Sequence, residues 1–568
     1  MKQLLTFLAF SLSTVVFGQP GVTIEVIGAR PVEPSYRIAG SPQIIDTLIP
    51  TPLVEYPLLS LKYETKTELE RINPASIKTT EHLEQLYKTY VKVGVGTELM
   101  PLGEIYFDAD RSRKYVYGAH LKHLSSFGNL PDFAPAQFDR TKLDLYGGIN
   151  EKKYTVGGNF HVGSQGLHYY GISDTLGLTR DSIAQRYNDI GFGGFFSSHK
   201  KDSANVNFKV GIDYNNYASR KPLDENREDW RARENYFAFS SGAWYKLGKE
   251  VFAADFNVRY NGYKYGVLDS SYTNLLDTGI VLNNTIINLR PTITTQLKNN
   301  RFKAKVGLDF TVNAHNKTSA HIYPIAELKY SLFNDIFIPY VGLRGEMKQT
   351  TFKSLTGRNE FLLSNVNMLN ENKVIDFYGG IKGTLSKRVS FNAGISFARV
   401  KNLALFVTDT TYSLGNKFNV IFDTATVTTI DGSVSYQLKE KLKVDAIAKF
   451  NSYSLLNNSY AWNLPNLQVI LRGTYNLFDK FIFTADLDIE QGRRALVYGP
   501  GEDIVLEDNQ YVKTLNFITD VNLSAEYRYN KRISAFVQFN NIASQRYMRW
   551  YNTPVQSFQV LGGVTFRF

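Results

Sequence analysis

The histidines have the chemistry of metal ligands, but their spacing argues against a metal site. The chain holds eight histidines and no cysteine. Two pairs lie close in the sequence, His120 with His123 and His161 with His168, each an odd number of positions apart. Because side chains alternate between the two faces of a strand, the members of each pair are expected on opposite faces. Ligands must converge on one ion, so the sequence predicts no metal site.

One pair of carboxylates could carry out acid–base chemistry. Asp108 and Asp110 in the stretch FDADR share one strand face, and paired carboxylates can act as general acid and base. A solvated turn is the reading that we favour. The sequence has no nucleophile elbow, P-loop or HExxH motif. We therefore expect neither an enzyme nor a bound cofactor.

The first 18 residues have the features of a secretory signal peptide. Lys2 supplies a positive start, Leu4–Phe17 is an apolar run, and small residues precede Gln19. The alternative is a buried N-terminal helix. Export would make nucleic acid an improbable partner, although the formal net charge is +11. With 43% hydrophobic residues, 14% aromatic residues and a mean hydropathy of −0.24, the chain fits neither disorder nor a helical membrane protein.

From Tyr90 onward, apolar and polar residues alternate with a period of two, which predicts the strands that would position any site. In Arg301–Asn313 apolar residues alternate with polar ones, and Leu442–Phe450 and Val521–Asn530 repeat the pattern. The segments are longer than average globular strands and match the length of tilted membrane strands. The charged residues of these three segments are predicted to line a lumen: Lys303, Lys305, Asp309, Lys443, Asp445, Lys449, Glu526 and Arg528. Their excess of lysine would favour anionic solutes, whereas an internal lattice of ion pairs is the reading that we slightly favour.

The connections alternate between short and long. Asn150–Lys153 and Lys439–Lys441 are short, whereas Arg220–Arg233, Phe352–Asn372 and Pro500–Gln510 are long. Tight periplasmic turns and long extracellular loops are typical of transmembrane barrels. The sequence thus predicts an all-β fold in which residues 90–568 form a transmembrane antiparallel β-barrel of about 22 strands.

The C-terminus resembles the insertion signal of outer-membrane proteins. Gly563, Phe566 and Phe568 match its pattern of glycine, aromatic and terminal aromatic residue. The last hairpin, with Asn540–Asn541 and a loop rich in Tyr and Trp, resembles the closing hairpin of TonB-dependent receptors. The resemblance implies a 22-stranded barrel in the outer membrane of a diderm bacterium. It also implies contact with outer-membrane lipid and insertion by the outer-membrane assembly machinery.

Residues 19–89 stand where such receptors carry a plug domain, and they are too few for a complete one. They are rich in proline, which indicates an extended periplasmic or luminal segment. One hexamer resembles a TonB box, although an ordinary β-prone hexamer is the alternative: Thr23, Ile24, Glu25, Val26, Ile27 and Gly28. The first hypothesis is a solute pore or transporter gated by this segment, with TonB as a partner. The second is a non-transporting structural subunit of a larger outer-membrane complex with other envelope proteins.

Overall fold

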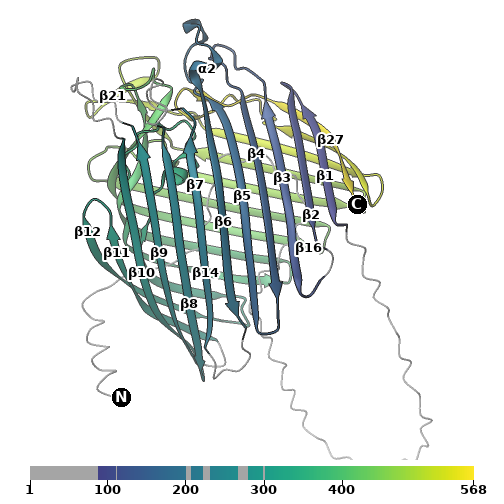
Figure 1. The fold of residues 1–568 in the computed structure, drawn as a ribbon, viewed down its shortest axis with the longest axis vertical. Coiled ribbons are helices and arrows are strands. Elements are labelled where there is room, and N and C mark those ends of the chain that lie inside the picture. Colours follow the sequence, from purple (N-terminus) through teal and green to yellow (C-terminus); the bar gives the residue numbers. More distant parts are fainter. Residues whose placement is uncertain (1–86, 110–111, 200–205, 222–230, 267–278, 298–300) are drawn as a thin grey trace, which may run out of the picture. The chain divides into compact units, whose positions relative to one another are not determined.

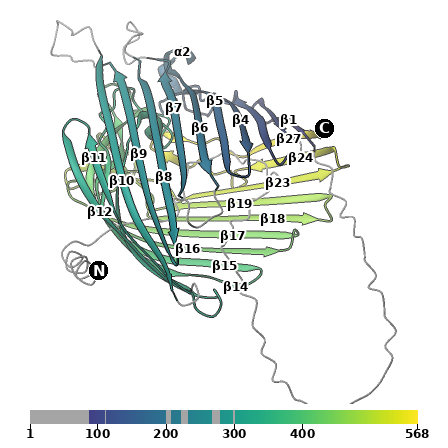
Figure 2. The same cartoon turned by 60° about the horizontal axis from the view of Figure 1, so that its bottom comes forward.

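The computed structural model describes residues 87–568 except 110–111, 200–205, 222–230, 267–278 and 298–300. The expected signal peptide at 1–18 and the TonB-box-like hexamer Thr23–Gly28 lie outside the described residues. Within them the chain forms one sheet of 22 strands, each antiparallel to its neighbours. The first strand pairs with the last, from Tyr90 opposite Arg567 to Gly96 opposite Leu561, so the sheet closes into a barrel (Figures 1 and 2). The predicted all-β barrel and its strand number are confirmed.

The wall strands follow one another in chain order. Their bounds are β1 Thr89–Gly96, β2 Met100–Asp108, β3 Tyr115–Ser126, β4 Phe138–Asn150, β5 Tyr154–His168, β6 Ala184–Ser198, β7 Asn207–Ser219, β8 Arg233–Leu247, β9 Glu250–Tyr265, β10 Ile280–Leu297, β11 Phe302–Ala314, β12 Thr318–Tyr330, β13 Ile338–Lys348, β14 Glu371–Ser386, β15 Val389–Asp409, β16 Lys417–Leu438, β17 Leu442–Leu455, β18 Leu467–Leu477, β19 Phe481–Gln491, β23 Ile518–Arg528, β24 Ile533–Asn540 and β27 Gln559–Arg567.

The remaining elements lie in loops. They are a 3₁₀ helix η1 Asp174–Leu176, helices α2 Arg180–Ile183 and α3 Phe352–Thr356, a small sheet of β20 Arg494–Val497, β21 Ile504–Glu507 and β22 Gln510–Thr514, and a ribbon of β25 Met548–Trp550 with β26 Thr553–Pro554. No helix in the described part of the chain is long and apolar enough to cross a membrane.

The two ends of the barrel differ in their connections. The turns that follow β4, β16 and β18 are only a few residues long, and they lie at what we call the short-turn end. The loops that follow β5, β13 and β19 are long and carry α2, α3 and β21, and they define the long-loop end. Figure 1 shows α2 and β21 together at that end. The predicted alternation of connection lengths is therefore seen in the structure.

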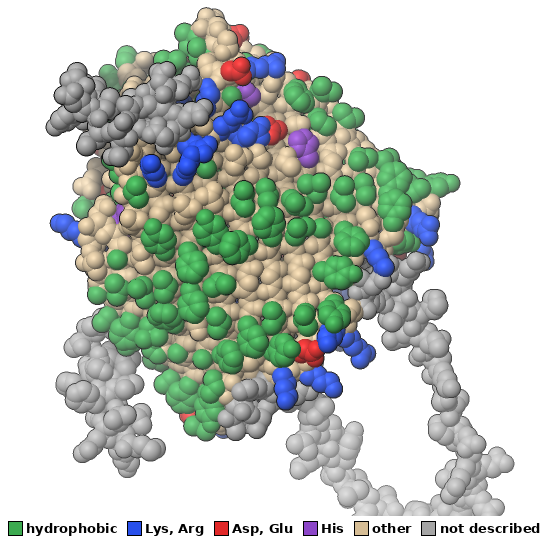
Figure 3. All heavy atoms as spheres, in the orientation of Figure 1, with side chains coloured by type: hydrophobic (Ala, Val, Ile, Leu, Met, Phe, Trp, Pro, Cys, Tyr) green, Lys and Arg blue, Asp and Glu red, His purple; other side chains and the backbone are tan. Residues whose placement is uncertain are grey.

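The wall has an apolar outer face and a polar inner face. In β11, Val306 and Leu308 are each 40% exposed, whereas Asp309 and Thr311 are buried. Figure 3 shows apolar side chains over the middle of the outer wall and Lys and Arg side chains toward its ends. An apolar band bounded by polar ends is the surface that a bilayer requires of a barrel.

Candidate functional site

A loop at the long-loop end is the strongest candidate for a functional element. Residues 349–370, here called the cap loop, connect β13 to β14 and contain α3. The helix begins with a capping box, in which the Thr351 hydroxyl accepts from the Ser354 amide and the Ser354 hydroxyl accepts from the Thr351 amide, each at 3.0 Å. This pairing satisfies two amides that a helix start would leave open.

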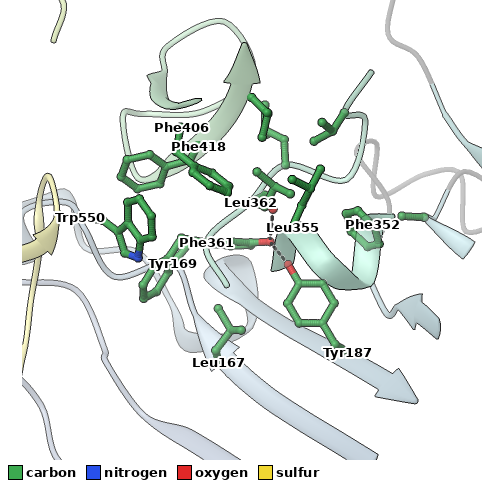
Figure 4. Close-up of a cluster of buried hydrophobic side chains, with 14 of the residues drawn as sticks. Leu167, Tyr169, Tyr187, Phe352, Leu355, Phe361, Leu362, Phe406, Phe418 and Trp550 are labelled. Carbon is green, nitrogen blue, oxygen red and sulfur yellow. Dashed lines mark hydrogen bonds between the residues drawn. The ribbon is translucent and has the colours of Figure 1, made fainter. Parts of the chain in front are cut away.

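The cap loop buries apolar side chains against inward-facing tyrosines of the wall. Phe352 is fully buried, and its ring centroid lies 5.3 Å from that of Tyr263 and 5.8 Å from that of Tyr217. The Tyr169 hydroxyl donates to the Leu362 carbonyl at 3.1 Å (Figure 4). Burial raises the pKa of Tyr169, so this hydroxyl stays protonated and able to donate.

The cap loop also reaches the opposite part of the wall. Leu362 forms a parallel bridge with Phe418 of β16, where the Leu363 amide donates to the Phe418 carbonyl at 2.9 Å. Phe418 and Phe406 of β15 lie beside Trp550 from the last loop (Figure 4). The loop therefore crosses the mouth of the barrel rather than leaving it.

Polar contacts also hold the cap loop against β4, β6 and β8. Arg140 of β4 lies 2.9 Å from the Glu360 carboxylate, and Lys353 lies 2.7 Å from Asp189 of β6. The buried Glu234 carboxylate of β8 accepts from the amides of Phe352 and Lys353 at the start of α3. A carboxylate at a helix start satisfies open amides there.

A further buried cluster packs on the other face of the tip of the β15–β16 hairpin, because Leu405 and Val407 alternate with Ala404 and Phe406, which lie at the cap loop. Leu405 and Val407 of β15 pack with Trp462 and Val512 in one buried cluster. In the loop after β19, Arg493 is 1% exposed and donates to the carbonyls of Met548, Arg549 and Asn516. Burial lowers the pKa of Arg493 to about 10, which leaves the guanidinium charged at neutral pH.

The cluster beneath the cap loop is as large as a small domain core. It contains 22 buried residues, seven of them from the cap loop: Phe352, Leu355, Phe361, Leu362, Leu363, Val366 and Met368. Burial of such a side chain contributes about 1.5–3 kcal/mol, so seven contribute on the order of 10 kcal/mol. The cap loop is thus a stably packed element across the mouth, and detaching it from the wall requires a comparable input of free energy.

All three carboxylates predicted to line the lumen take part in ion pairs. The Asp309 side chain is 1% exposed and accepts from Arg290 Nε at 3.0 Å. Lys443 Nζ lies 3.1 Å from Asp445. The Glu526 carboxylate lies 3.3 Å from Arg528 and 3.5 Å from Arg567. These contacts have the form of the ion-pair lattice that the sequence offered as one reading.

The lysines form a second group. Among the described residues, Lys303, Lys305 and Lys449 have no carboxylate within 4 Å of their amines. Lys303 lies directly opposite Lys329 in the strand register, and Lys382 of β14 experiences the charge of both. Lys329 pairs with Glu327 at 2.6 Å, which leaves this part of the inner face with more positive than negative charge.

The other residues singled out from the sequence take structural positions. His120 contacts Glu104 at 2.9 Å and His123 contacts Thr141 at 2.8 Å, with different partners on separate strands. Asp108 accepts from the Tyr146 hydroxyl near the short-turn end, and Asp110 lies outside the described residues. In the part of the chain that the structure describes, no group of acidic and histidine side chains is arranged to hold a metal ion.

The C-terminal motif lies at the seam where the barrel closes. Gly563 is opposite Gly94 of β1 and Phe566 is opposite Val91. A Cβ on Gly563 would overlap the Val93 carbonyl oxygen, so close approach of the two strands depends on glycine there. Phe568 is 67% exposed. Gly563 therefore has a structural role at the seam, in addition to its expected role in the assembly signal.

The cap loop is the feature that sequence reasoning missed. Phe352–Asn372 was predicted only as a long extracellular loop. A signal was present, because Phe361, Leu362 and Leu363 form an apolar run where a surface loop would be polar.

Comparison with known proteins identifies the fold. No protein-family model and no curated protein matches the sequence. The copper transporter OprC is similar in structure, with 13% identity and a TM-score of 0.59 over 85% of this chain and 82% of that chain. The ferripyoverdine receptor of the Pseudomonas aeruginosa outer membrane has 12% identity and a TM-score of 0.60 over 85% and 72%.

The FrpB iron transporter from Neisseria meningitidis has 9% identity and a TM-score of 0.64 over 86% and 82%. At such identities the similarity establishes a shared barrel fold.

Proposed function

We propose that this protein is an outer-membrane barrel of the TonB-dependent receptor type, which moves a solute through its lumen and is gated at both ends. The observation that carries the proposal is the stably packed cap loop across the mouth of a closed barrel with a charged inner face. The long-loop end would face the cell surface. The segment 19–89 would gate the short-turn end, with Thr23–Gly28 as the contact for TonB.

The similar structures are a copper transporter, a ferripyoverdine receptor and an iron transporter, so their names do not indicate one class of solute. We therefore infer the solute class from the charges on the inner face of the wall. These names indicate transporters and receptors rather than enzymes, in keeping with the expectation of a non-enzymatic protein. Like charges directly opposite across two strands destabilise the pair, and Lys303 and Lys329 are placed in this way. A passing anion would relieve their repulsion, so we expect anionic solutes to be preferred.

Conductance of four forms in a planar bilayer tests the double gate. The forms are the full mature chain, a deletion of residues 19–86, a replacement of residues 351–369 by a short Gly-Ser linker, and both changes together. We expect steady current only from the double variant, because each gate closes the path alone. Current from the first deletion alone would show that the cap loop is no barrier, and a silent double variant would refute the pore.

Selectivity is then measured on the conducting form. Lys303→Glu should move the reversal potential toward cation preference, because it reverses a charge that has no carboxylate within 4 Å among the described residues. Lys443→Glu is the matched control, since its charge is already paired with Asp445 at 3.1 Å. An equal shift in both would place selectivity elsewhere.

A structural subunit is the second candidate function, favoured by the same tight packing of the cap loop. In that case the lumen would never open, and the charged inner face would brace the wall. A native pull-down in mild detergent tests this: stoichiometric envelope partners would support the subunit, and a monomer that conducts after both deletions would exclude it.

A further inference from the structure

A row of cations lies on the outer face of β6–β9, beyond the apolar band. Arg233 and Lys264 are direct partners in the register of β8 and β9. Arg186 and Arg220 are adjacent one row further on, where the Arg220 amide donates to the Arg186 carbonyl at 2.7 Å. Arg220 and Arg233 are exposed. We call these four residues the cation row, and Figure 3 shows Lys and Arg side chains gathered beyond the apolar band on this side of the barrel.

Alternation along the strand fixes the direction of these side chains. In β8, Glu234 is buried beneath the cap loop whereas Arg233 and Asn235 are exposed. In β9, Tyr263 is buried against the cap loop, so its neighbour Lys264 belongs to the outer face. The cation row therefore faces whatever surrounds the barrel and not the lumen.

A row of aromatic residues marks the level of the membrane interface beneath it. The register aligns one outer-facing aromatic residue on each of five strands: Phe160, Phe192, Tyr214, Phe237 and Tyr260. The hydroxyls of Tyr214 and Tyr260 donate to Asn235 and Asn283, at 2.9 and 2.8 Å, on the side toward the long-loop end. Rings in the apolar band with hydroxyls directed to polar neighbours are typical of an interfacial aromatic girdle.

The height of the cation row above this girdle matches that of lipid headgroups. Arg233 is four residues beyond Phe237, and Lys264 is four residues beyond Tyr260. Four residues extend about 13 Å along a strand, which is about 10 Å along the barrel axis at a tilt of 35–45°. Phosphates of the outer leaflet lie within that distance of the acyl boundary, and long Arg and Lys side chains can reach back toward them.

Among the residues that the structure describes, the charge of the row is only partly neutralised. Asp139 of β4 pairs with Arg186 through two contacts of 2.6 and 2.8 Å. Within the described ranges no carboxylate lies within 4 Å of Arg220, Arg233 or Lys264. Because Arg233 and Lys264 are like charges directly opposite each other, their pairing is unfavourable unless an anion bridges them. A phosphate group suits both, since Arg binds it through two parallel hydrogen bonds and Lys as a point charge.

From this geometry we infer that the cation row binds the phosphate groups of a lipid in the leaflet at the long-loop end. The inference rests on the proposed membrane location. The lipid would pack its acyl chains on the apolar band and place its phosphate between Arg233 and Lys264. It is a fixed lipid contact on the wall, separate from the path of the solute.

Binding of a diphosphorylated lipid A to the barrel in neutral nanodiscs tests the inference. We compare the full mature chain with the double variant Arg233→Ser and Lys264→Ser. The control is Lys387→Ser with Arg388→Ser, two exposed cations in the turn between β14 and β15. We expect the double variant to raise the dissociation constant at least about tenfold, the factor that a loss of about 1.4 kcal/mol gives, and the control to leave it unchanged.

Equal affinity of the double variant and the parent would overturn the inference. So would inorganic phosphate that displaces the lipid at equal concentration, because it would show a free-anion site. Both results require a parent that inserts into the nanodisc. A parent that fails to insert would refute the proposed membrane function itself, so the two failures are distinguishable.

Discussion

The substitution Phe352→Ala tests whether the cap loop is a packed element or a loose lid. Phe352 is fully buried, and the centroids of three tyrosine rings lie around it at 5.3, 5.8 and 6.1 Å. Removal of a buried phenylalanine costs about 3–5 kcal/mol. Because each 1.4 kcal/mol is a factor of ten, the opened fraction should rise roughly 100- to 4,000-fold.

Hydrogen exchange read by mass spectrometry measures this opening directly. Amides protected by a local structure exchange in proportion to its opening equilibrium. The informative amides are those of Leu363, which donates to Phe418, and of Leu355, which donates to the Thr351 carbonyl at 3.0 Å. In Phe352→Ala they should exchange faster by the factor above, while peptides of β4 and β5 keep their parental rates.

The control and the refuting result follow from exposure. Phe478 lies in the turn between β18 and β19 and is 78% exposed, so Phe478→Ala should leave exchange in the cap loop unchanged. If the parental cap loop already exchanged within seconds, its packing would not close the mouth. Unchanged exchange in Phe352→Ala would likewise refute the argument from burial.

Three further predictions concern the wall and its seam. Asp309→Ala should destabilise the barrel by about 1–3 kcal/mol, because it leaves the partly buried Arg290 without its partner. Asp445→Ala should cost about 1 kcal/mol or less, because it removes a more exposed ion pair. The midpoint of the heat-induced band shift on gels compares the two variants. Gly563→Ala should lower that midpoint because its Cβ would overlap the Val93 carbonyl oxygen, and Gly562→Ala should not, since its nearest contact is 3.8 Å away. Phe568→Ala should reduce the amount of folded barrel in membranes, and Phe568→Tyr should restore it; equal amounts in both would remove the residue from the assembly signal.

Much of the wall could be predicted from local sequence. The alternation in Phe302–Ala314 encodes a strand and its two faces without reference to any other part of the chain, because side-chain direction depends only on position along the strand. Short and long connections then fix the order of neighbours, since antiparallel strands joined by tight turns pair with each other. The resemblance of the last strand to a known closing hairpin could also be seen from sequence, because its glycine and aromatic residues lie in one contiguous segment.

The site depended on the tertiary structure. Whether Asp309 meets Arg290, or Lys303 faces Lys329, depends on register between strands, which a shift of one residue would change. The outer-facing cation row also arises from register, because Arg233 and Lys264 are distant in sequence. The fold of the cap loop required closure of the barrel: only a closed wall places the tyrosines of β6, β7 and β9 around Phe352 while β16 pairs with Leu362. Sequence thus determined the strands and their faces, and the closed sheet decided which residues meet across the mouth.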